Sequence, residues 1–231
     1  MSAKLILVPT PIADDLPWDE FTKSRLSEAV SQNAAIVVEE HKIARRKWIS
    51  NGLDREAIDK FLLLNEHTRA ESSQEVIQIL KSGRDVYLMS DCGIPAFCDP
   101  GQKLVERCHQ NGIQVTSLPF SNSVILAVAL SGFPSDRFIF EGFIARDNRM
   151  GALKTIIRNK ETTVLMDTPY RLSKLVGELD QLQPNREIFF GLDLNSPSEL
   201  LVRGSIKDIV KALNNINKRE FVVVLGPNDR R

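Results

Sequence analysis

The chain contains little cysteine and no long apolar run, and each shortage excludes a class of protein. Its three cysteines are an odd number, which excludes a framework of fully paired disulfides and favours a reducing compartment. No apolar stretch reaches the roughly 18 residues that a membrane-spanning helix needs. The first residues lead directly into a predicted strand at 4–8 rather than into a signal peptide. We therefore expect a soluble, cytoplasmic protein without a membrane partner.

Net charge and the commonest nucleotide-binding motifs are also absent. The 30 Lys and Arg residues balance the 30 Asp and Glu residues, so the overall charge favours no class of partner. The sequence contains no GxGxxG loop, GxxxxGK[ST] loop or GxSxG elbow, which removes the strongest signatures of dinucleotide-binding proteins, P-loop ATPases and α/β-hydrolases. The histidines and cysteines show no metal-ligand spacing, so we expect no metal.

The first half of the chain alternates between strand-like and helix-like patterns. The predicted strands are 5–8, 34–38, 86–89 and 114–118, and the predicted helices are 20–32, 56–64, 71–82 and 102–110. Alternation of this kind indicates βαβ units and therefore a mostly parallel sheet. With 231 residues and 42% hydrophobic residues, the chain can bury one large core or two smaller ones.

The sequence of the second half predicts a sheet of a different kind. A helix of small residues at 124–131 comes first, and the last strands, at 187–192, 200–204 and 220–225, follow each other closely enough for antiparallel pairing. We therefore predict an α/β protein with two α/β domains, residues 1–118 with a mostly parallel sheet and residues 119–231 with a mixed sheet.

The segment SDCGIPAFCDPG, residues 90–101, is the most informative in the sequence. It lies between the predicted strand 86–89 and the helix 102–110, and the carboxyl ends of parallel strands are where ligands bind in open α/β sheets. Asp91 has the chemistry to accept a hydrogen bond from an ammonium group or a ribose hydroxyl, although capping its own turn is an equally common use of aspartate. The loops at 9–11 and 119–121 also follow predicted strands, so the three loops are expected at one edge of the sheet.

Two basic stretches bear on the choice of substrate. One is HKIARRKW at 41–48, and the other comprises Arg146, Arg149, Lys154, Arg158 and Lys160. Together they favour a phosphate-rich substrate, whereas each taken alone is more typical of a solvated helix face. Trp48 either stacks on a base or anchors its helix to the core.

Four segments, in order, resemble those of a known family. LVPTPI at 7–12 is similar to the family's opening loop, and residues 90–101 are similar to its SDAGxP…DPG loop. SGFPSDRF…EGF at 131–143 resembles its SGLPxDRF…EGF segment, and TPYR at 168–171 resembles its SPHR. The chain thus resembles the tetrapyrrole (corrin/porphyrin) methylases nearly end to end, and most of all their branch of ribosomal small-subunit RNA 2′-O-methyltransferases, methyltransferase I.

This resemblance implies two α/β domains with S-adenosylmethionine in the cleft between them, and usually a homodimer. It places the cofactor against the loops of the first domain and the adenine against residues of the second. The cofactor-binding residues that it implies are Pro9, Thr10, Pro11, Asp91, Gly93, Ile94, Pro95, Ser121, Met166 and Leu192.

The segments expected to face the substrate depart from the family pattern. GNLxDIT is replaced by ADDLPW at 13–18, EDTR by EHK at 40–42, PGPSA by PFSNS at 119–123 and RELTK by LDLNS at 192–196. The resemblance therefore implies the cofactor more directly than it implies the RNA target.

Three functions follow from these observations. The first is an S-adenosylmethionine-dependent methyltransferase acting on the ribose 2′-O of ribosomal RNA in the small subunit. Such a reaction benefits from a base, for which Glu39, Glu40 and Glu66 are candidates, although each is also an ordinary surface carboxylate. The alternatives are a methylase of a tetrapyrrole-like small molecule, which needs no strong base, and a protein that binds the cofactor without catalysis.

Overall fold

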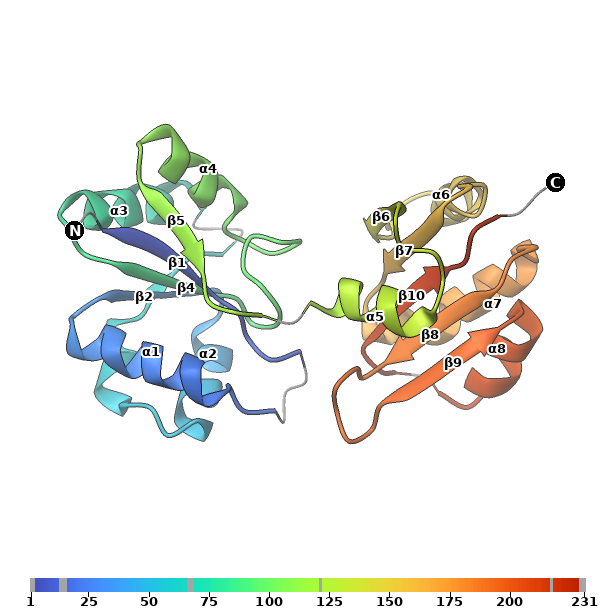
Figure 1. Ribbon diagram of the computed structural model, residues 1–231, viewed down its shortest axis with the longest axis horizontal. Coiled ribbons are helices and arrows are strands. Elements are labelled where there is room, and N and C mark those ends of the chain that lie inside the picture. Colours follow the sequence, from blue (N-terminus) through green and yellow to red (C-terminus); the bar gives the residue numbers. More distant parts are fainter. Residues whose placement is uncertain (1–2, 13–15, 66–68, 121, 217, 229–231) are drawn as a thin grey trace. The chain divides into compact units, whose positions relative to one another are not determined.

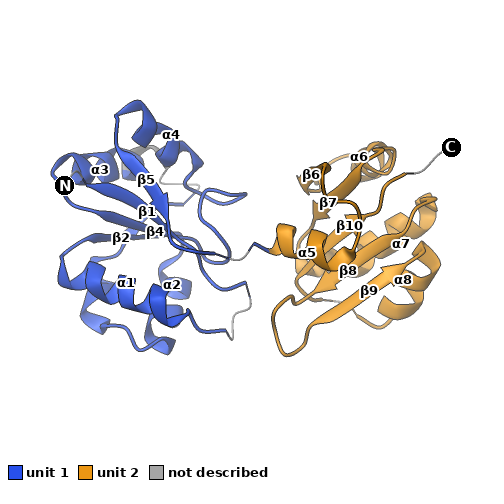
Figure 2. Ribbon diagram, in the orientation of Figure 1, with its two compact units in different colours: residues 1–122 blue, residues 123–231 orange. Residues whose placement is uncertain are grey.

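The chain folds as two units, residues 1–122 and residues 123–231 (Figure 2). The computed structural model describes residues 3–12, 16–65, 69–120, 122–216 and 218–228, without the side chains of 69–71. Between the units, the chain leaves the last strand of unit 1 at Ser117 and enters the first helix of unit 2 at Ser123. The division thus falls a few residues after the predicted boundary at Leu118.

Unit 1 is built on a parallel sheet. Its strands are β1 (Lys4–Val8), β2 (Ala35–Val38), β3 (Leu62–Leu63), β4 (Val86–Met89) and β5 (Gln114–Ser117), in the order β3-β2-β4-β1-β5. All of these pairings are parallel, which confirms the mostly parallel sheet. The two-residue strand β3 and the 3-10 helix η1 (Arg55–Lys60) replace the helix predicted at 56–64.

Helices cover both faces of this sheet (Figure 1). They are α1 (Glu20–Ser31), α2 (His41–Ser50), α3 (Arg69–Lys81) and α4 (Gln102–Gln110). Side chains alternate along β1, so that Ile6 packs with α1 and α2 while Leu5 packs with α3 and α4. A sheet covered on both faces needs apolar strands throughout, and β2 and β4 are buried over their whole length.

Unit 2 contains a mixed sheet, as predicted. Its strands are β6 (Phe138–Phe143), β7 (Thr162–Met166), β8 (Ile188–Leu192), β9 (Leu200–Gly204) and β10 (Phe221–Leu225), in the order β6-β7-β10-β8-β9. Only β6 and β7 pair in parallel, and the other pairs are antiparallel.

The helices of unit 2 lie on both faces of the sheet (Figure 1). α6 (Arg149–Ile156), α7 (Leu172–Leu182) and α8 (Ile206–Leu213) pack on one face, and α5 (Ser123–Ser131) packs on the other. The central strand β10 is buried at every position, because it receives side chains from both layers. Within the described part of the chain, no helix combines the length and apolarity needed to cross a bilayer.

Candidate functional site

Two neighbouring strands of unit 1 lead to helices on opposite faces of the sheet. β1 pairs directly with β4, yet the chain continues from β1 to α1 on one face and from β4 to α4 on the other. This is a topological switch point, where open α/β sheets bind their ligands beyond the carboxyl ends of the strands. The predicted binding loops 9–11 and 90–101 both begin there.

The structure brings these two loops into direct contact. The backbone N–H of Thr10 donates to the carbonyl of Gly93 at 2.7 Å, and the N–H of Gly93 donates to the carbonyl of Thr10 at 3.0 Å. The buried hydroxyl of Thr10 also donates to the carbonyl of Ser90 at 2.8 Å, and the indole N–H of Trp18 donates to the carbonyl of Pro9 at 2.9 Å. Thr10 and Gly93 therefore lie side by side, so the loops 9–11 and 90–101 meet at one edge of the sheet, as predicted.

Gly93 leaves open space at this contact. Its φ is +73°, in the left-handed region that favours glycine, and a Cβ at this position would meet no atom within 4 Å. Next to it, Ile94 is half-buried and Pro95 is buried. This backbone is thus accessible to a ligand at Gly93 and fixed behind it by Pro95.

The rest of the loop folds tightly against the sheet. Ala96 and Cys98 adopt positive φ values of +67° and +63°, which is uncommon for residues other than glycine and concentrates at functional loops. Gly101, with φ +124°, closes the loop, and a Cβ there would lie 2.9 Å from Leu88 Cδ2. A cavity of about 60 Å³ beneath this turn, lined partly by Asp99, has room for water but not for a nucleoside.

Three carboxyl groups gather at the same edge. Glu39 follows β2, Asp91 follows β4 and Asp99 lies further along the loop. The backbone N–H of Asp91 donates to Glu39 Oε2 at 3.2 Å, so the chain segments after β2 and β4 touch. We call these three residues the acid cluster.

The acid cluster is short of positive charge. Burial, and next the charge of Glu39, raise the pKa of Asp91 to about 6, with a partial offset from Lys47. Burial, followed by the charges of Glu39 and Asp91, raises the pKa of Asp99 to about 7. Carboxyls in such surroundings favour a ligand that brings a cation. No group of three metal-binding side chains is arranged to hold a metal ion in the described parts of the chain.

The candidate bases have different positions. Glu39 belongs to the acid cluster, whereas the exposed Glu40 caps α2 by accepting the N–H of Lys42 at 3.0 Å. Glu66 and the predicted cofactor contact Ser121 lie outside the described residues. Sequence reasoning did not single out Asp99, although its place in the DPG segment was a signal.

The basic stretches offer less free charge than the sequence suggested. Trp48 is fully buried, and its indole N–H donates to the carbonyl of Asp54 at 2.7 Å. It therefore anchors α2 to the core and does not stack on a base. Lys47 and Arg149 are also buried, with 5% and 7% of their surface exposed. The prediction that they belong to solvent-facing basic stretches is therefore wrong.

The implied contacts of unit 2 lie at one edge of its sheet. Met166 ends β7 and Leu192 ends β8, and both strands run antiparallel to β10 between them. Met166 is half-buried, whereas the side chain of Leu192 is completely buried against the helices. Leu192 as a whole residue has none of its surface exposed, and its role in binding the cofactor stays a prediction.

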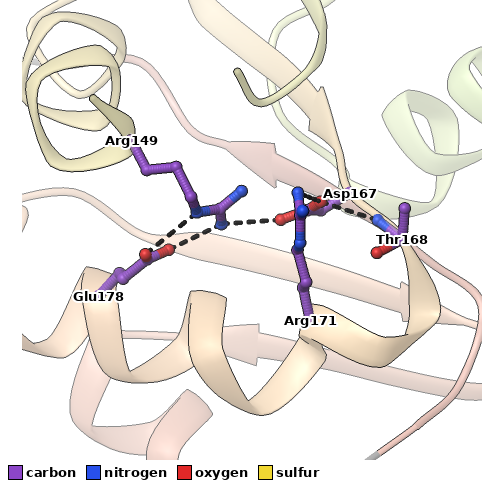
Figure 3. Close-up of polar contacts among 5 residues, drawn as sticks. All are labelled: Arg149, Asp167, Thr168, Arg171 and Glu178. Carbon is purple, nitrogen blue, oxygen red and sulfur yellow. Dashed lines mark hydrogen bonds and ion pairs between the residues drawn. The ribbon is translucent and has the colours of Figure 1, made fainter. Parts of the chain in front are cut away.

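A buried ion network fixes the chain beyond Met166 (Figure 3). Arg149 Nη2 lies 2.7 Å from both Asp167 Oδ2 and Glu178 Oε2, and Arg149 Nε donates to Glu178 Oε1 at 3.1 Å. Asp167 Oδ1 accepts the backbone N–H of Thr168 at 2.8 Å and lies 3.4 Å from Arg171 Nη1. Arg149 Nη1 finds no acceptor in the described residues. The network joins α6, α7 and the end of β7.

Comparisons with known proteins agree with one another. Residues 21–210 match the family model of tetrapyrrole (corrin/porphyrin) methylases. Ribosomal RNA small subunit methyltransferase I of Thermotoga maritima is 32% identical over 229 residues, covering 96% of this chain and 98% of that protein. The protein of the same name from Leptospira borgpetersenii is 35% identical over 173 residues, covering 72% of this chain and 68% of that protein.

Among solved structures, one neighbour is uroporphyrin-III C-methyl transferase from Thermus thermophilus, complexed with S-adenyl homocysteine. It superposes with a TM-score of 0.55 at 16% identity, over 97% of each chain. At this sequence identity the comparison shows a shared fold and nothing more.

Replacing Asp99 by asparagine is expected to stabilise unit 1 at high pH. The folded pKa of about 7 lies above the ordinary value of 3.8 for an aspartate, so the stability linked to this group is lost as pH rises from the unfolded pKa through the folded pKa. Asparagine remains neutral, and its gain at pH 8.5 should be about 1 kcal/mol, well below the full shift because water screens a half-buried carboxyl. Urea unfolding at pH 5.5 and 8.5 measures it, with the exposed Asp59→Asn as control. Equal effects of the two substitutions at both pH values would contradict this interpretation.

Replacing Arg149 by methionine is expected to destabilise unit 2 by about 3–5 kcal/mol, because two buried carboxylates lose their cation. Adding Asp167→Asn should restore part of this loss. The exposed pair of Arg203 and Glu187 provides the control, since Glu187→Gln should cost less than about 1 kcal/mol. Urea unfolding followed by circular dichroism compares the variants, and a small loss in Arg149→Met would show that the network is dispensable.

Proposed function

Because the chain belongs to the family of tetrapyrrole (corrin/porphyrin) methylases, we propose that it is an S-adenosylmethionine-dependent methyltransferase of small-subunit ribosomal RNA. The observation that carries the proposal is the end-to-end match to the Thermotoga maritima relative, which spans 98% of that protein. The proposed acceptor is a ribose 2′-hydroxyl. Among solved structures, the uroporphyrin-III methyltransferase neighbour supports only the fold. Ribosomal RNA as the substrate therefore rests on the names of the relatives, and the 2′-hydroxyl rests on the resemblance of the sequence motifs.

The residues at the switch point fit the cofactor chemically. When bound, S-adenosylmethionine supplies a methyl group on a positively charged sulfur, next to an ammonium and a carboxylate. The acid cluster provides negative charge that no described cation fully offsets. Gly93 leaves backbone open to a close approach. Pro9, Thr10, Pro11, Ile94 and Pro95 complete the proposed contacts in unit 1, and Ser121, Met166 and Leu192 are proposed to add the rest.

Few catalytic groups are needed for this reaction. The leaving sulfide is neutral and needs no acid, so alignment of the reactants supplies most of the acceleration. A ribose hydroxyl, by contrast, has to lose its proton. Glu39 is the described candidate best placed to accept it, because it lies in the acid cluster rather than capping a helix.

We propose a homodimer in the cytoplasm, without a membrane or metal partner. The supporting observation is the outer side of α5, where Ile125 and Leu130 are 57% and 40% exposed. Because the other side of this helix already packs on the sheet of unit 2, apolar residues on both sides fit a helix that a second protein surface covers.

Asp91→Asn is expected to weaken cofactor binding at least about tenfold, since a charge facing a cation is lost. Calorimetry with S-adenosylmethionine and S-adenosylhomocysteine measures it, with NAD as a negative control ligand and Asp59→Asn as the control variant. Wild-type affinity should also fall below pH 6, where Asp91 becomes protonated. If the wild type binds neither sulfur ligand, the cofactor assignment fails.

At saturating S-adenosylmethionine, Glu39→Gln is expected to slow methyl transfer about 100-fold or more, the size of a typical general-base contribution. Cofactor affinity is expected to fall as well, because Glu39 contributes charge to the acid cluster. The assay follows transfer of a labelled methyl group to unmodified small ribosomal subunits and locates it by nuclease digestion. Glu40→Gln serves as the matched control. No transfer by the wild type to small subunits would contradict the proposed substrate, and equal rates for both variants would remove Glu39 as the base.

A further inference from the structure

An exposed aromatic ring with a cation on it lies just beyond β7 in unit 2. Tyr170 is 74% exposed, the highest value among the large hydrophobic side chains of the described residues. The ammonium nitrogen of Lys218 lies 4.2 Å from the centre of its ring. Lys218 belongs to the exposed segment that leads into β10.

The backbone beneath this ring is fixed. Tyr170 sits in the 3-10 turn η2 (Pro169–Arg171), which Pro169 begins and which the N–H of Arg171 closes by donating to the carbonyl of Thr168 at 2.9 Å. Arg171 is also paired with the buried Asp167. Figure 3 shows Arg171 of this turn beside Asp167 in the buried ion network, so the network fixes the backbone that carries the ring.

The segment that carries Lys218 is tied to the same support. The hydroxyl of Ser173, in the first turn of α7, donates to the carbonyl of Ile216 at 3.0 Å. The ring and the ammonium group thus come from two chain segments joined by a hydrogen bond. Their pairing depends on the fold and not on neighbouring sequence positions.

A second cation–π pair in the same unit shows the contrast. Arg203 lies 4.5 Å from the ring centre of Phe133, but that ring is only 7% exposed, so the pair is part of the packing. A pair that is exposed on the surface contributes only about 0.5–1 kcal/mol. Stability therefore does not account for the exposed ring of Tyr170.

We propose that Tyr170 and Lys218 form a contact surface for single-stranded RNA. In this arrangement a base stacks on the phenol ring and the ammonium group meets a phosphate, the two contacts that single-strand-binding proteins combine. The inference rests on the proposed function and names the part of the enzyme that holds its substrate.

Charge favours RNA over a second protein chain at this surface. The outer side of α5 is purely apolar at Ile125 and Leu130, which suits a protein partner. Tyr170 instead carries a cation and a phenol hydroxyl. The neighbouring Arg219 is engaged with Asp193 at 2.6 Å, whereas Lys218 lies on the exposed ring, so we assign the phosphate contact to Lys218. Because η2 follows β7 directly, the surface lies at the edge of the unit 2 sheet where β7 ends with Met166.

The test compares Tyr170→Ala, Tyr170→Phe and Lys218→Ala with the wild type. Fluorescence anisotropy measures binding to a short single-stranded RNA and to small ribosomal subunits over a range of salt concentrations. Tyr170→Ala should weaken binding roughly five- to 100-fold at an unchanged salt slope, and Tyr170→Phe should keep wild-type affinity. Lys218→Ala should lower the slope of log K against log salt by about one. Leu201→Ala and Lys211→Ala remove an exposed apolar side chain and an exposed cation elsewhere in unit 2 and should leave binding unchanged.

The cofactor affinity and the methyl-transfer rate of each variant separate the two proposals. Loss of RNA affinity with an unchanged affinity for S-adenosylmethionine supports the surface. If Tyr170→Ala binds RNA as tightly as the wild type, the proposed RNA surface is wrong and the proposed function stays intact. The same holds if sedimentation shows that the variant loses the dimer while its RNA affinity is unchanged. RNA binding without methyl transfer by the wild type overturns the function, yet the binding comparison still decides about the surface. A wild type that binds no RNA overturns both.

Discussion

Two backbone hydrogen bonds between Thr10 and Gly93 hold the candidate site of unit 1 together. β1 and β4 stop pairing at Val8 and Met89, and from there the chain leaves toward opposite faces of the sheet. Without a link beyond the strands, the two loops would separate and expose unpaired backbone groups, which is costly. The link keeps Gly93 beside the first loop, and the tight turn up to Gly101 follows from that position.

The two units treat buried acids in opposite ways. In unit 2, Asp167 and Glu178 share the cation of Arg149, and Arg171 also pairs with Asp167, so two cations balance two carboxylates and the network acts as a support. In unit 1, Asp91 and Asp99 have raised pKa values beside Glu39, so their charge is only partly balanced. A protein that leaves negative charge unbalanced at a strand edge loses stability there, and a cationic ligand offsets that loss. This contrast is the reason for proposing unit 1 as the part of the chain that holds the sulfonium group.

Sequence reasoning predicted the sheets and the loop at 90–101 because glycine, proline and strand periodicity act locally. It could not decide between two roles for Trp48, since burial depends on how α2 packs. The ion network went unnoticed because Arg149 and Asp167 are distant in the sequence, and their charges look like those of any surface. The complete burial of Leu192 also depends on packing between distant segments, so the sequence could not show it.

Methyl transfer from a sulfonium group asks little of the catalyst beyond alignment, which explains how one fold serves a porphyrin-type acceptor in one relative and ribosomal RNA in others. The choice of acceptor then has to come from side chains that are exposed at the ends of the sheets and are not required for the stability of the fold. Tyr170 is such a side chain, because the network around Asp167 fixes its backbone while its exposed ring adds little to stability. In unit 1 the fold constrains the residues proposed to meet the cofactor, whereas at the proposed RNA surface it constrains only the backbone beneath Tyr170, so the side chains there can change without loss of the fold.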